Sequence, residues 1–355
     1  PQGFFNDSIG IIFENNIYNG VVDAGSYRPH SVELKTPPNN GIATVNPTTK
    51  AIEYTPNTDF TGVDTFEVAL IENFVELGVS TITITVLEAP ISNLAGEVGT
   101  VDIDHNWQTI SFTSAIENPV IVMGPATANE IDPMSIRIRN VTPLGFDVRI
   151  VDEDVADTHV AETVSWMAVS EGTHTLADGN ILEAFKITTN KNMKSEYETI
   201  SLTGHTATPI GLYQVQTYNN EIYLNSRIQS ISDTTLQIGL DRQENVSDNL
   251  PIEEEIGVVL ISPTSTFASD STATQGSQTH NVETYSFSTP TTGHGIFANT
   301  QSRNGGDPCF LRISAINANS VDMFISEDVS QSPEQNHGGS EVSTAVLLPH
   351  GQLFR

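Results

Sequence analysis

Apolar and polar residues alternate with a period of about two along much of this chain. The alternation is clearest over Ser80–Val86, Ser135–Val141 and Thr235–Leu240, where Ile, Leu or Val recurs at about every second position. A period of two places successive side chains on opposite faces of a strand, and Thr, Val and Ile favour strands. Turn-forming clusters such as Pro37–Gly41 and Arg303–Asp307 separate these runs. The pattern predicts an all-β protein of the sandwich or barrel class.

One block of residues recurs three times. It reads WQTISF from Trp107, YETISL from Tyr197 and VETYSF from Val282. Thirty residues after the start of each block, an arginine opens an alternating strand. These arginines are Arg137, Arg227 and Arg312. Two anchors held at one separation in three places indicate three copies of one structural unit.

The repeats and the polar stretches between them divide the chain. We predict an N-terminal spacer domain over residues 1–90 and a linker from Leu87 to Gly99. The three repeats are expected over residues 100–192, 193–277 and 278–355. The predicted fold class is all-β, with one N-terminal sandwich followed by three repeated antiparallel β-sandwich domains.

The charge balance points to an extracellular setting. The chain has 14 Lys and Arg against 44 Asp and Glu, a formal net charge of −30, which repels phosphate backbones and anionic membrane surfaces. We therefore expect no nucleic-acid partner, and because the sequence has no run of about eighteen apolar residues we expect no membrane insertion. The single cysteine, Cys309, allows no intrachain disulfide and is expected in the core. These features favour an exported bacterial protein, extracellular or at the cell surface, of which this chain is a mature form or a fragment.

The N-terminal domain carries a recognisable motif. Residues Tyr54–Phe66 read YTPNTDFTGVDTF. This motif resembles the bacterial immunoglobulin- and cadherin-like modules that occur in tandem in large secreted and surface proteins. The resemblance covers residues 1–88 and implies a sandwich that acts as a spacer, with Tyr54 and Phe66 pointing inward. Some relatives bind calcium between modules, and Asp59 and Asp64 are the candidates here, with turn capping as the alternative role.

The first repeat carries a second resemblance. In order along the chain it contains Thr109–Phe112, Pro119-Val120, Arg137, Asn140–Thr142, Gly145-Phe146 and Val164–Ala168. This order resembles the H-type lectin domain, a six-stranded antiparallel sandwich. The other two copies keep the arginine but lose the Val-Thr and Gly-Phe pairs. The resemblance implies binding of galactose-type or N-acetylgalactosamine sugars, and trimers with sugar sites near subunit contacts. The three copies could imitate such a trimer or lie in a row.

The repeated arginines are the first candidates for ligand binding, because a rigid guanidinium fork suits paired hydroxyls. The alternative role for Arg137, Arg227 and Arg312 is an ion pair within the repeat, with a carboxylate such as Asp132 or Glu153. The acidic loops before the last strand of copies one and three follow as candidates, with solvated charged loops as the alternative. Their candidate residues are Asp152, Asp154, His159, Glu327 and Asp328.

Motifs for catalysis and metal binding are weak or absent. Asp102 and Asp104 open a D-x-D-x-N segment like a calcium loop, but the glycine and the closing glutamate are missing. Alternation with Val101 and Ile103 favours a strand there. Calcium is the one cofactor considered. No sequence motif of a hydrolase, metalloprotease or phosphate-binding loop occurs, and the nine histidines lack zinc-ligand spacing. We therefore do not expect an enzyme.

Two function classes follow. The first is a carbohydrate-binding or adhesive region of an exported protein, whose partners are extracellular glycans or surface polysaccharide and whose copies add avidity. The second is a structural subunit of an extracellular filament, sheath or surface layer, in which the repeats serve self-association.

Overall fold

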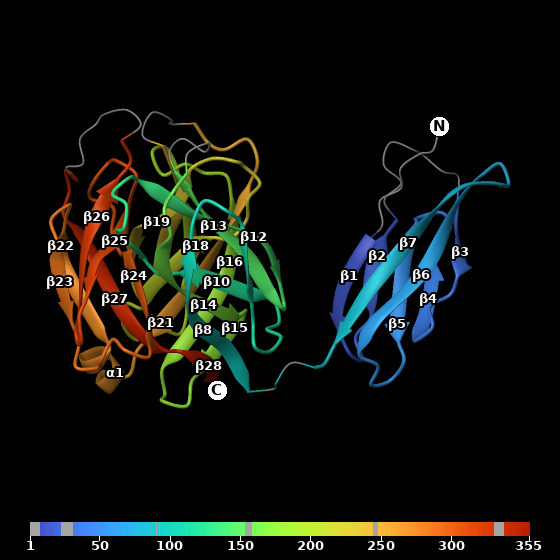
Figure 1. The fold of residues 1–355 in the computed structure, drawn as a ribbon, viewed down its shortest axis with the longest axis horizontal. Helices are drawn as coiled ribbons and strands as arrows, with labels where there is room; N and C mark the ends of the chain where they lie inside the picture. Colours follow the sequence, from blue (N-terminus) through green and yellow to red (C-terminus); the bar gives the residue numbers. More distant parts are fainter. Residues whose placement is uncertain are drawn as a thin grey trace. The chain divides into compact units, whose positions relative to one another are not determined.

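A computed structural model describes residues 8–22, 31–89, 91, 93–152, 158–243, 248–329 and 337–355. Its elements confirm the all-β prediction, because these residues form strands β1 to β28 and one short helix, α1 (Ser265–Asp270) (Figure 1). The chain forms two compact units, residues 1–92 and residues 93–355. We describe each unit by itself.

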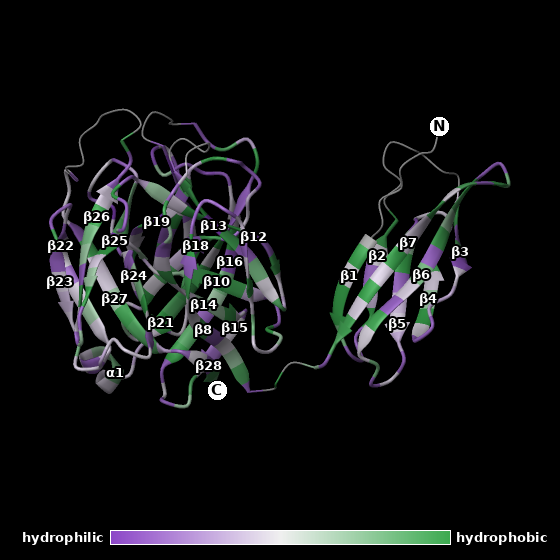
Figure 2. Ribbon diagram, in the orientation of Figure 1, coloured by the Kyte–Doolittle hydropathy of each residue, from purple (hydrophilic) through white to green (hydrophobic). Residues whose placement is uncertain are grey.

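The N-terminal unit is a sandwich of two sheets with the strand orders β1-β7-β6-β3 and β2-β5-β4. Hydrophobic and hydrophilic residues alternate along its strands (Figure 2). Tyr54 and Phe66 are buried between the sheets, as predicted, with ring centroids 5.9 Å apart. The strands are β1 (Ser8–Phe13), β2 (Tyr18–Val21), β3 (Ser31–Thr36), β4 (Gly41–Val45), β5 (Ala51–Pro56), β6 (Gly62–Glu72) and β7 (Val75–Leu87).

The two acidic residues proposed for calcium in this unit have separate surroundings. Asp64 is buried, and its carboxylate accepts hydrogen bonds from the backbone N–H groups of Asn39 (3.1 Å) and Asn40 (2.8 Å) and from the hydroxyl of Tyr54 (3.0 Å). Asp59 is exposed, with a φ of 58°. Asp64 therefore caps the loop before β4, which is the alternative role considered for it.

The larger unit contains the three copies, and each copy is a six-stranded antiparallel sandwich. The first, third and last strands of a copy form an inner sheet, and the other three form an outer sheet. Copy one contains β8 (Leu94–Ile103), β9 (Gln108–Ser111), β10 (Pro119–Met123), β12 (Met134–Thr142), β13 (Gly145–Asp152) and β14 (Glu162–Ser170). Copy two contains β16 (Ile181–Thr189), β17 (Glu198–Ser201), β18 (Ile210–Val215), β19 (Leu224–Ile231), β20 (Thr235–Arg242) and β21 (Glu254–Ser262). Copy three contains β22 (Thr272–Gln278), β23 (Glu283–Ser286), β24 (His294–Thr300), β25 (Cys309–Ile316), β26 (Ser320–Glu327) and β27 (Glu341–Pro349).

Each copy begins earlier than the predicted bounds. Strand β16 pairs with β21, the last strand of copy two, and β22 pairs with β27, the last strand of copy three. Strand β8 pairs with β14 from Gly96 onward, so the linker predicted to reach Gly99 ends before β8. The repeated sequence block is therefore the second strand of each copy, and the bounds at residues 100, 193 and 278 are corrected to the starts of β8, β16 and β22.

The three inner sheets pack against one another around a shared core. This core includes Val98 and Val122 of copy one, Leu212 and Val259 of copy two, and Phe297 of copy three. Inner strands are consequently buried on both faces, which explains unbroken apolar runs such as the one in β14. The three copies thus form one closed body and do not lie in a row.

Two further strands close this arrangement. Strand β15 (Gly172–Thr175) follows copy one and adds to the inner sheet of copy two beside β16. Strand β28 (Gly351–Phe354) follows copy three and adds to the inner sheet of copy one beside β8. A short strand, β11 (Ala126–Thr127), also pairs in parallel with β25, which joins copy one to copy three.

Two side chains of the larger unit lie in its core, and one of them, Cys309, was expected there. Trp166 packs inside copy one beside Phe112 and Phe146. Gly99 faces its indole, and a Cβ atom at this glycine would lie 2.6 Å from the ring. Cys309 is buried at the start of β25, the strand that carries Arg312.

Candidate functional site

The three repeated arginines lie at the junctions between copies. Each guanidinium forms an ion pair with the glutamate that opens the last strand of another copy. The pairs are Arg137–Glu254 at 3.2 Å, Arg227–Glu341 at 2.6 Å and Arg312–Glu162 at 2.7 Å. All six side chains are fully buried. The cycle runs from copy one to two, two to three and three to one, so it links every neighbouring pair.

The main partner of each arginine therefore belongs to another copy, and only Arg227, among the described residues, also has an ion-pair partner within its own repeat, Asp241 at 3.5 Å. Asp132 accepts a bond from Arg312 only through its backbone carbonyl, and it belongs to copy one. Glu153 and Asp154 lie outside the described residues. A buried cation needs a desolvated partner that is held in place. Each junction glutamate meets this need, because it also caps a loop of its own copy.

The glutamate caps follow one pattern. Glu254 accepts bonds from the N–H groups of Asn219 (3.2 Å) and Asn220 (2.8 Å). Glu341 accepts equivalent bonds from Asn304 and Gly305, and Glu162 from Asn129 and Glu130. Burial alone would raise the pKa of Glu341, but His337, Arg227 and these donors lower it to about 2. Burial alone would also raise the pKa of Glu162, but His159, Thr127 and the loop donors lower it, so Glu162 and Glu341 are charged at neutral pH.

Histidines complete two of the three junctions. In copy one, Nδ1 of His159 lies 2.8 Å from Asp152 and its Nε2 lies 3.4 Å from Glu162. In copy three, His337 lies 2.8 Å from Glu327 and 3.0 Å from Glu341. Burial alone would lower the pKa of His159, but the two carboxylates raise it to about 9. The pKa of His337 is raised for the same reason.

Copy two has no histidine before its junction glutamate: the buried Leu250 stands there, ahead of Glu254. Copy two instead has an acid near its own arginine, because Asp241 lies 3.5 Å from Arg227.

The candidate residues of the acidic loops that the structure describes are also buried: Asp152, His159, Glu327 and Asp328. Asp152, His159, Glu327 and the three arginines are committed to the junctions, and Asp328 is buried as well, so these residues present almost no surface to a sugar. Asp102 lies in β8 and accepts a bond from Thr163, while Asp104 caps the turn at Asn106. Among the described residues, no His, Cys, Asp and Glu side chains are grouped to hold a metal ion.

An open groove of about 510 Å³ lies at the junction between copies one and two. Copy one supplies the start of β10 and the segment Arg139–Pro143, at the end of β12 and in the turn that follows. Copy two supplies Lys186 of β16, the segment Gln216–Asn219 after β18, and the start of β21. This volume falls in the range of small-ligand sites.

Several charged groups of the groove have bonding capacity to spare. The side chains of Lys186 and Glu221 make no hydrogen bond or ion pair with any residue in the described part of the chain. Glu255 accepts one bond, from the amide of Gln216 at 2.7 Å. Arg139 uses its Nε to reach Asp147 at 3.3 Å, and its terminal nitrogens bond to no other described residue. Hydroxyl groups of a ligand could bond to these carboxylates and cations.

An aromatic and cationic stack holds one wall of the groove. The guanidinium of Arg139 lies 4.0 Å above the ring of Trp107, and that of Arg149 lies 4.8 Å from Trp107 and 5.1 Å from Tyr218. Arg149 also donates a hydrogen bond to the hydroxyl of Tyr218. Such cation–π contacts orient both partners. They fix Tyr218 and Arg139, which both line the groove.

The stack is not repeated at the other junctions. The alignment of the copies by their arginines places Ala128 and Arg303 at the position of Tyr218. It places Gln229 and Ser314 at the position of Arg139. The groove residues were not predicted, because nothing in the repeat singles out Tyr218. The usable signal was a difference between copies: copy one alone has Trp, Arg and Arg at positions 107, 139 and 149.

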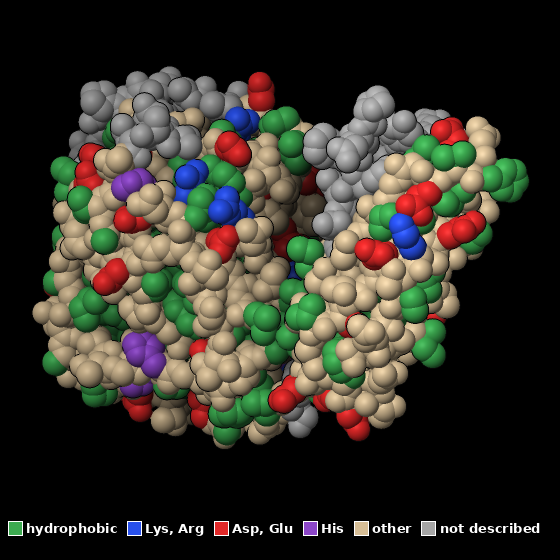
Figure 3. Space-filling view, turned by 45° about the vertical axis from the view of Figure 1, so that its right-hand side comes forward, with side chains coloured by type: hydrophobic (Ala, Val, Ile, Leu, Met, Phe, Trp, Pro, Cys, Tyr) green, Lys and Arg blue, Asp and Glu red, His purple; other side chains and the backbone are tan. Residues whose placement is uncertain are grey.

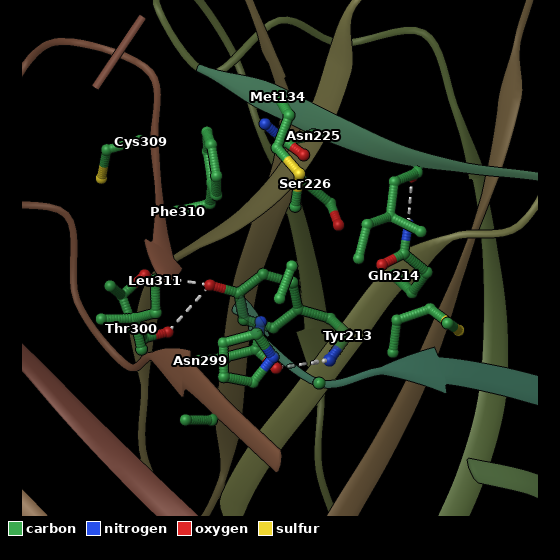
Figure 4. A pocket seen from close by; sticks show the side chains of 16 residues that line it. Met134, Tyr213, Gln214, Asn225, Ser226, Asn299, Thr300, Cys309, Phe310 and Leu311 are labelled. Atoms are coloured by element: carbon green, nitrogen blue, oxygen red, sulfur yellow. Dashed lines mark hydrogen bonds between the residues drawn. The ribbon is translucent and has the colours of Figure 1, made fainter. Parts of the chain in front are cut away.

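A third feature is a cavity where the three copies meet. Met134 of copy one, Tyr213 of copy two and Phe310 of copy three all line it (Figure 4). Tyr213 donates a hydrogen bond to the carbonyl of Thr300 at 3.0 Å, across the boundary between copies two and three. The cavity volume is only about 60 Å³, which admits a few waters but no sugar ring. It is a packing feature of the closed body.

Comparison with known proteins adds one relative. No protein-family model matches the chain. Over 246 residues the chain is 27% identical to halomucin of Haloquadratum walsbyi (strain DSM 16790 / HBSQ001), an alignment that covers 65% of the chain and 3% of halomucin. The chain thus corresponds to a small part of that relative. Similarity to a protein named as a mucin agrees with the expected extracellular setting and fits an adhesive or structural protein. The described residues include no helix long and apolar enough to cross a membrane.

Proposed function

We propose that the closed three-copy unit is a carbohydrate-binding module, and that the groove between copies one and two is its binding site. The observation that carries this proposal is the convergence of Tyr218 with free charged groups in one open groove. Sugar sites combine an apolar or aromatic wall with a few fixed polar groups. Tyr218 supplies the wall, and Arg139, Lys186, Glu221 and Glu255 supply donors and acceptors.

The placement of the groove supports the same proposal. It lies at a contact between two copies, which is where the resemblance to H-type lectins implies a sugar site. Copy one also retains the fullest set of that family's motif residues. The face of the protein in Figure 3 is mostly neutral and polar, with scattered acids and few cations. A surface of this kind suits uncharged, hydroxyl-rich ligands better than polyanions.

A glycan array probed with the full chain tests this function. We expect saturable binding to galactose-type or N-acetylgalactosamine glycans, with and without calcium. Glu221→Gln should weaken that binding about ten-fold, because it removes a charged acceptor from the groove. Glu53→Gln, at an exposed glutamate of the N-terminal unit, is the matched control and should change nothing.

A blank array under both calcium conditions would overturn the proposal. It would favour the alternative of a structural subunit, for which electron microscopy of the concentrated protein should then show filaments or sheets. Binding that Glu221→Gln and Glu53→Gln leave equally strong would retain the carbohydrate function but reject the groove as its site.

A further inference from the structure

A second hollow, of about 270 Å³, lies within copy two. Its walls are β15, β16, the loop Thr203–Thr208 between β17 and β18, and the end of β21 at Ser262. It shares no residue with the groove at the first junction. Its lining is rich in hydroxyl groups, because four threonines and one serine contribute to it.

A histidine is held firmly in the wall of this hollow. Nε2 of His205 lies 2.8 Å from the carboxylate of Glu183, and Nδ1 lies 2.9 Å from the hydroxyl of Ser262. The side chain of His205 is only 5% exposed. An ionised carboxylate can only accept, so Nε2 must carry the proton. The histidine therefore ties the loop to β16 and β21 in one orientation.

The equivalent glutamate of copy one has a different hydrogen-bond partner. Strand register places Glu97 of β8 at the position of Glu183, and the alignment of the copies places Ala115 at the position of His205. In copy one, Glu97 accepts bonds from the backbone N–H (2.8 Å) and the hydroxyl (2.7 Å) of Thr113. In copy one, Glu97 therefore accepts the hydrogen bonds of the loop that begins at Thr113.

In copy two the acid is bound to His205, and the loop is left without that partner. Thr203, the counterpart of Thr113, makes no hydrogen bond with any residue in the described ranges, and neither do Thr206 and Thr208. The hollow thus presents hydroxyl and N–H groups that only solvent or a ligand can satisfy. Beside them lie the apolar side chains of Ile181 and Pro263.

We infer that this hollow is a second binding site, for a single neutral monosaccharide unit. Threonine hydroxyls and the second oxygen of Glu183 would bond to the sugar hydroxyls, and Ile181 and Pro263 would contact the C–H face of the ring. The inference is independent of the groove. With both sites occupied, one chain would bind two sugar units of a polysaccharide and gain avidity.

The test follows the imidazole resonance of His205 in the full chain, labelled with carbon-13 histidine. The probes are methyl α-galactoside, methyl α-glucoside and methyl N-acetyl-α-galactosaminide, and His205→Gln identifies the signal. We expect at least one glycoside to shift this resonance saturably. Thr203→Val removes a hydroxyl from the exposed loop and leaves the His205 contacts in place. It should raise the dissociation constant obtained from this titration about ten-fold.

Two outcomes separate this site from the groove. If Tyr218→Ala abolishes array binding while the His205 titration persists, both sites stand. If none of the three glycosides moves the His205 resonance, or if Thr203→Val leaves a titration unchanged, the second site is rejected whatever the array shows.

Discussion

The buried ion pairs recur at every junction between copies, whereas the aromatic and cationic stack of the open groove occurs at one junction only. The Arg–Glu ion pair occurs at all three junctions, with the same strand positions and the same loop capped by the glutamate. The groove residues Tyr218 and Arg139 occur at the first junction only. Features common to every copy hold the closed body together, whereas the feature that singles out one junction is free to recognise a ligand.

Removal of a repeated arginine should give the largest effect. Arg227→Met leaves Glu341 and Asp241 buried beside an uncharged side chain, so the free energy of unfolding should fall by about 3–5 kcal/mol. Denaturant unfolding of the full chain measures it. The matched control is Lys191→Met, which removes a half-exposed pair with Glu198 and should cost less than about 1 kcal/mol. Equal losses in the two variants would show that the arginine is not a junction residue.

The histidine junctions should make stability depend on pH. The folded pKa of His159 is raised to about 9, above its unfolded value of about 6.5. Its contribution is therefore full below about pH 6.5 and is lost as the pH rises through about 9. We expect a loss on the order of 2 kcal/mol, measured by denaturant unfolding at each end of this range.

The control for that prediction is His159→Gln, which should reduce the pH dependence of stability and leave only the part that His337 supplies. The junction of copies one and two has Leu250 in place of a histidine and cannot supply this titration. If the free energy of unfolding of His159→Gln depends on pH as strongly as that of the wild type, groups other than His159 cause the effect.

A groove substitution should alter binding more than folding. Arg139→Ala should weaken glycan binding about ten-fold, or roughly 1.4 kcal/mol. The free energy of unfolding should change by only about 1 kcal/mol, because the Arg139–Asp147 pair is partly exposed. Gln229→Ala, at the equivalent position of copy two, should change neither quantity. Titration calorimetry and denaturant unfolding compare them, and loss of binding in both variants would break the distinction between the first junction and the second.

The smallest effect should come from salt. A formal charge of −30 makes the folded chain repel itself, and salt screens exposed charges but not buried pairs. Raising sodium chloride from about 0.05 M to about 1 M should therefore stabilise the protein by about 1 kcal/mol. Thermal unfolding at several salt concentrations checks this, and a fall in Tm would mean that screening of the partly exposed ion pairs outweighs relief of self-repulsion.

Much of the fold could be predicted from sequence, because local patterns encode it. The constant spacing from Trp107 to Arg137 revealed the copies, and the resemblance of Tyr54–Phe66 to a known sandwich module placed Tyr54 and Phe66 inward. The first strand of each copy was not assigned to its copy, and for β8 and β22 the reason is physical. Strand β8 contains glycines where it packs against β14 and alternates only at its end, at Val101 and Ile103, while β22 reads TATQGSQ and shows no apolar alternation.

The partners of the candidate residues could not be predicted, since they depend on how the copies meet. Arg137 and Glu254 are 117 residues apart, and no spacing within a repeat relates them. The groove was hidden for the same reason: Tyr218 belongs to copy two, while the arginines that orient it belong to copy one. Asp154 lies outside the described residues, so its role stays a prediction.

The central claim is that the unrepeated groove, and not the repeated framework, recognises the ligand. Its most direct test is the affinity of Tyr218→Ala and of Tyr197→Ala for the glycan that binds best on the array. Tyr197 is the partly exposed residue that stands in copy two where copy one has Trp107. We predict at least a ten-fold loss for Tyr218→Ala and no change for Tyr197→Ala. Full affinity in Tyr218→Ala, with its fold intact, would contradict the claim.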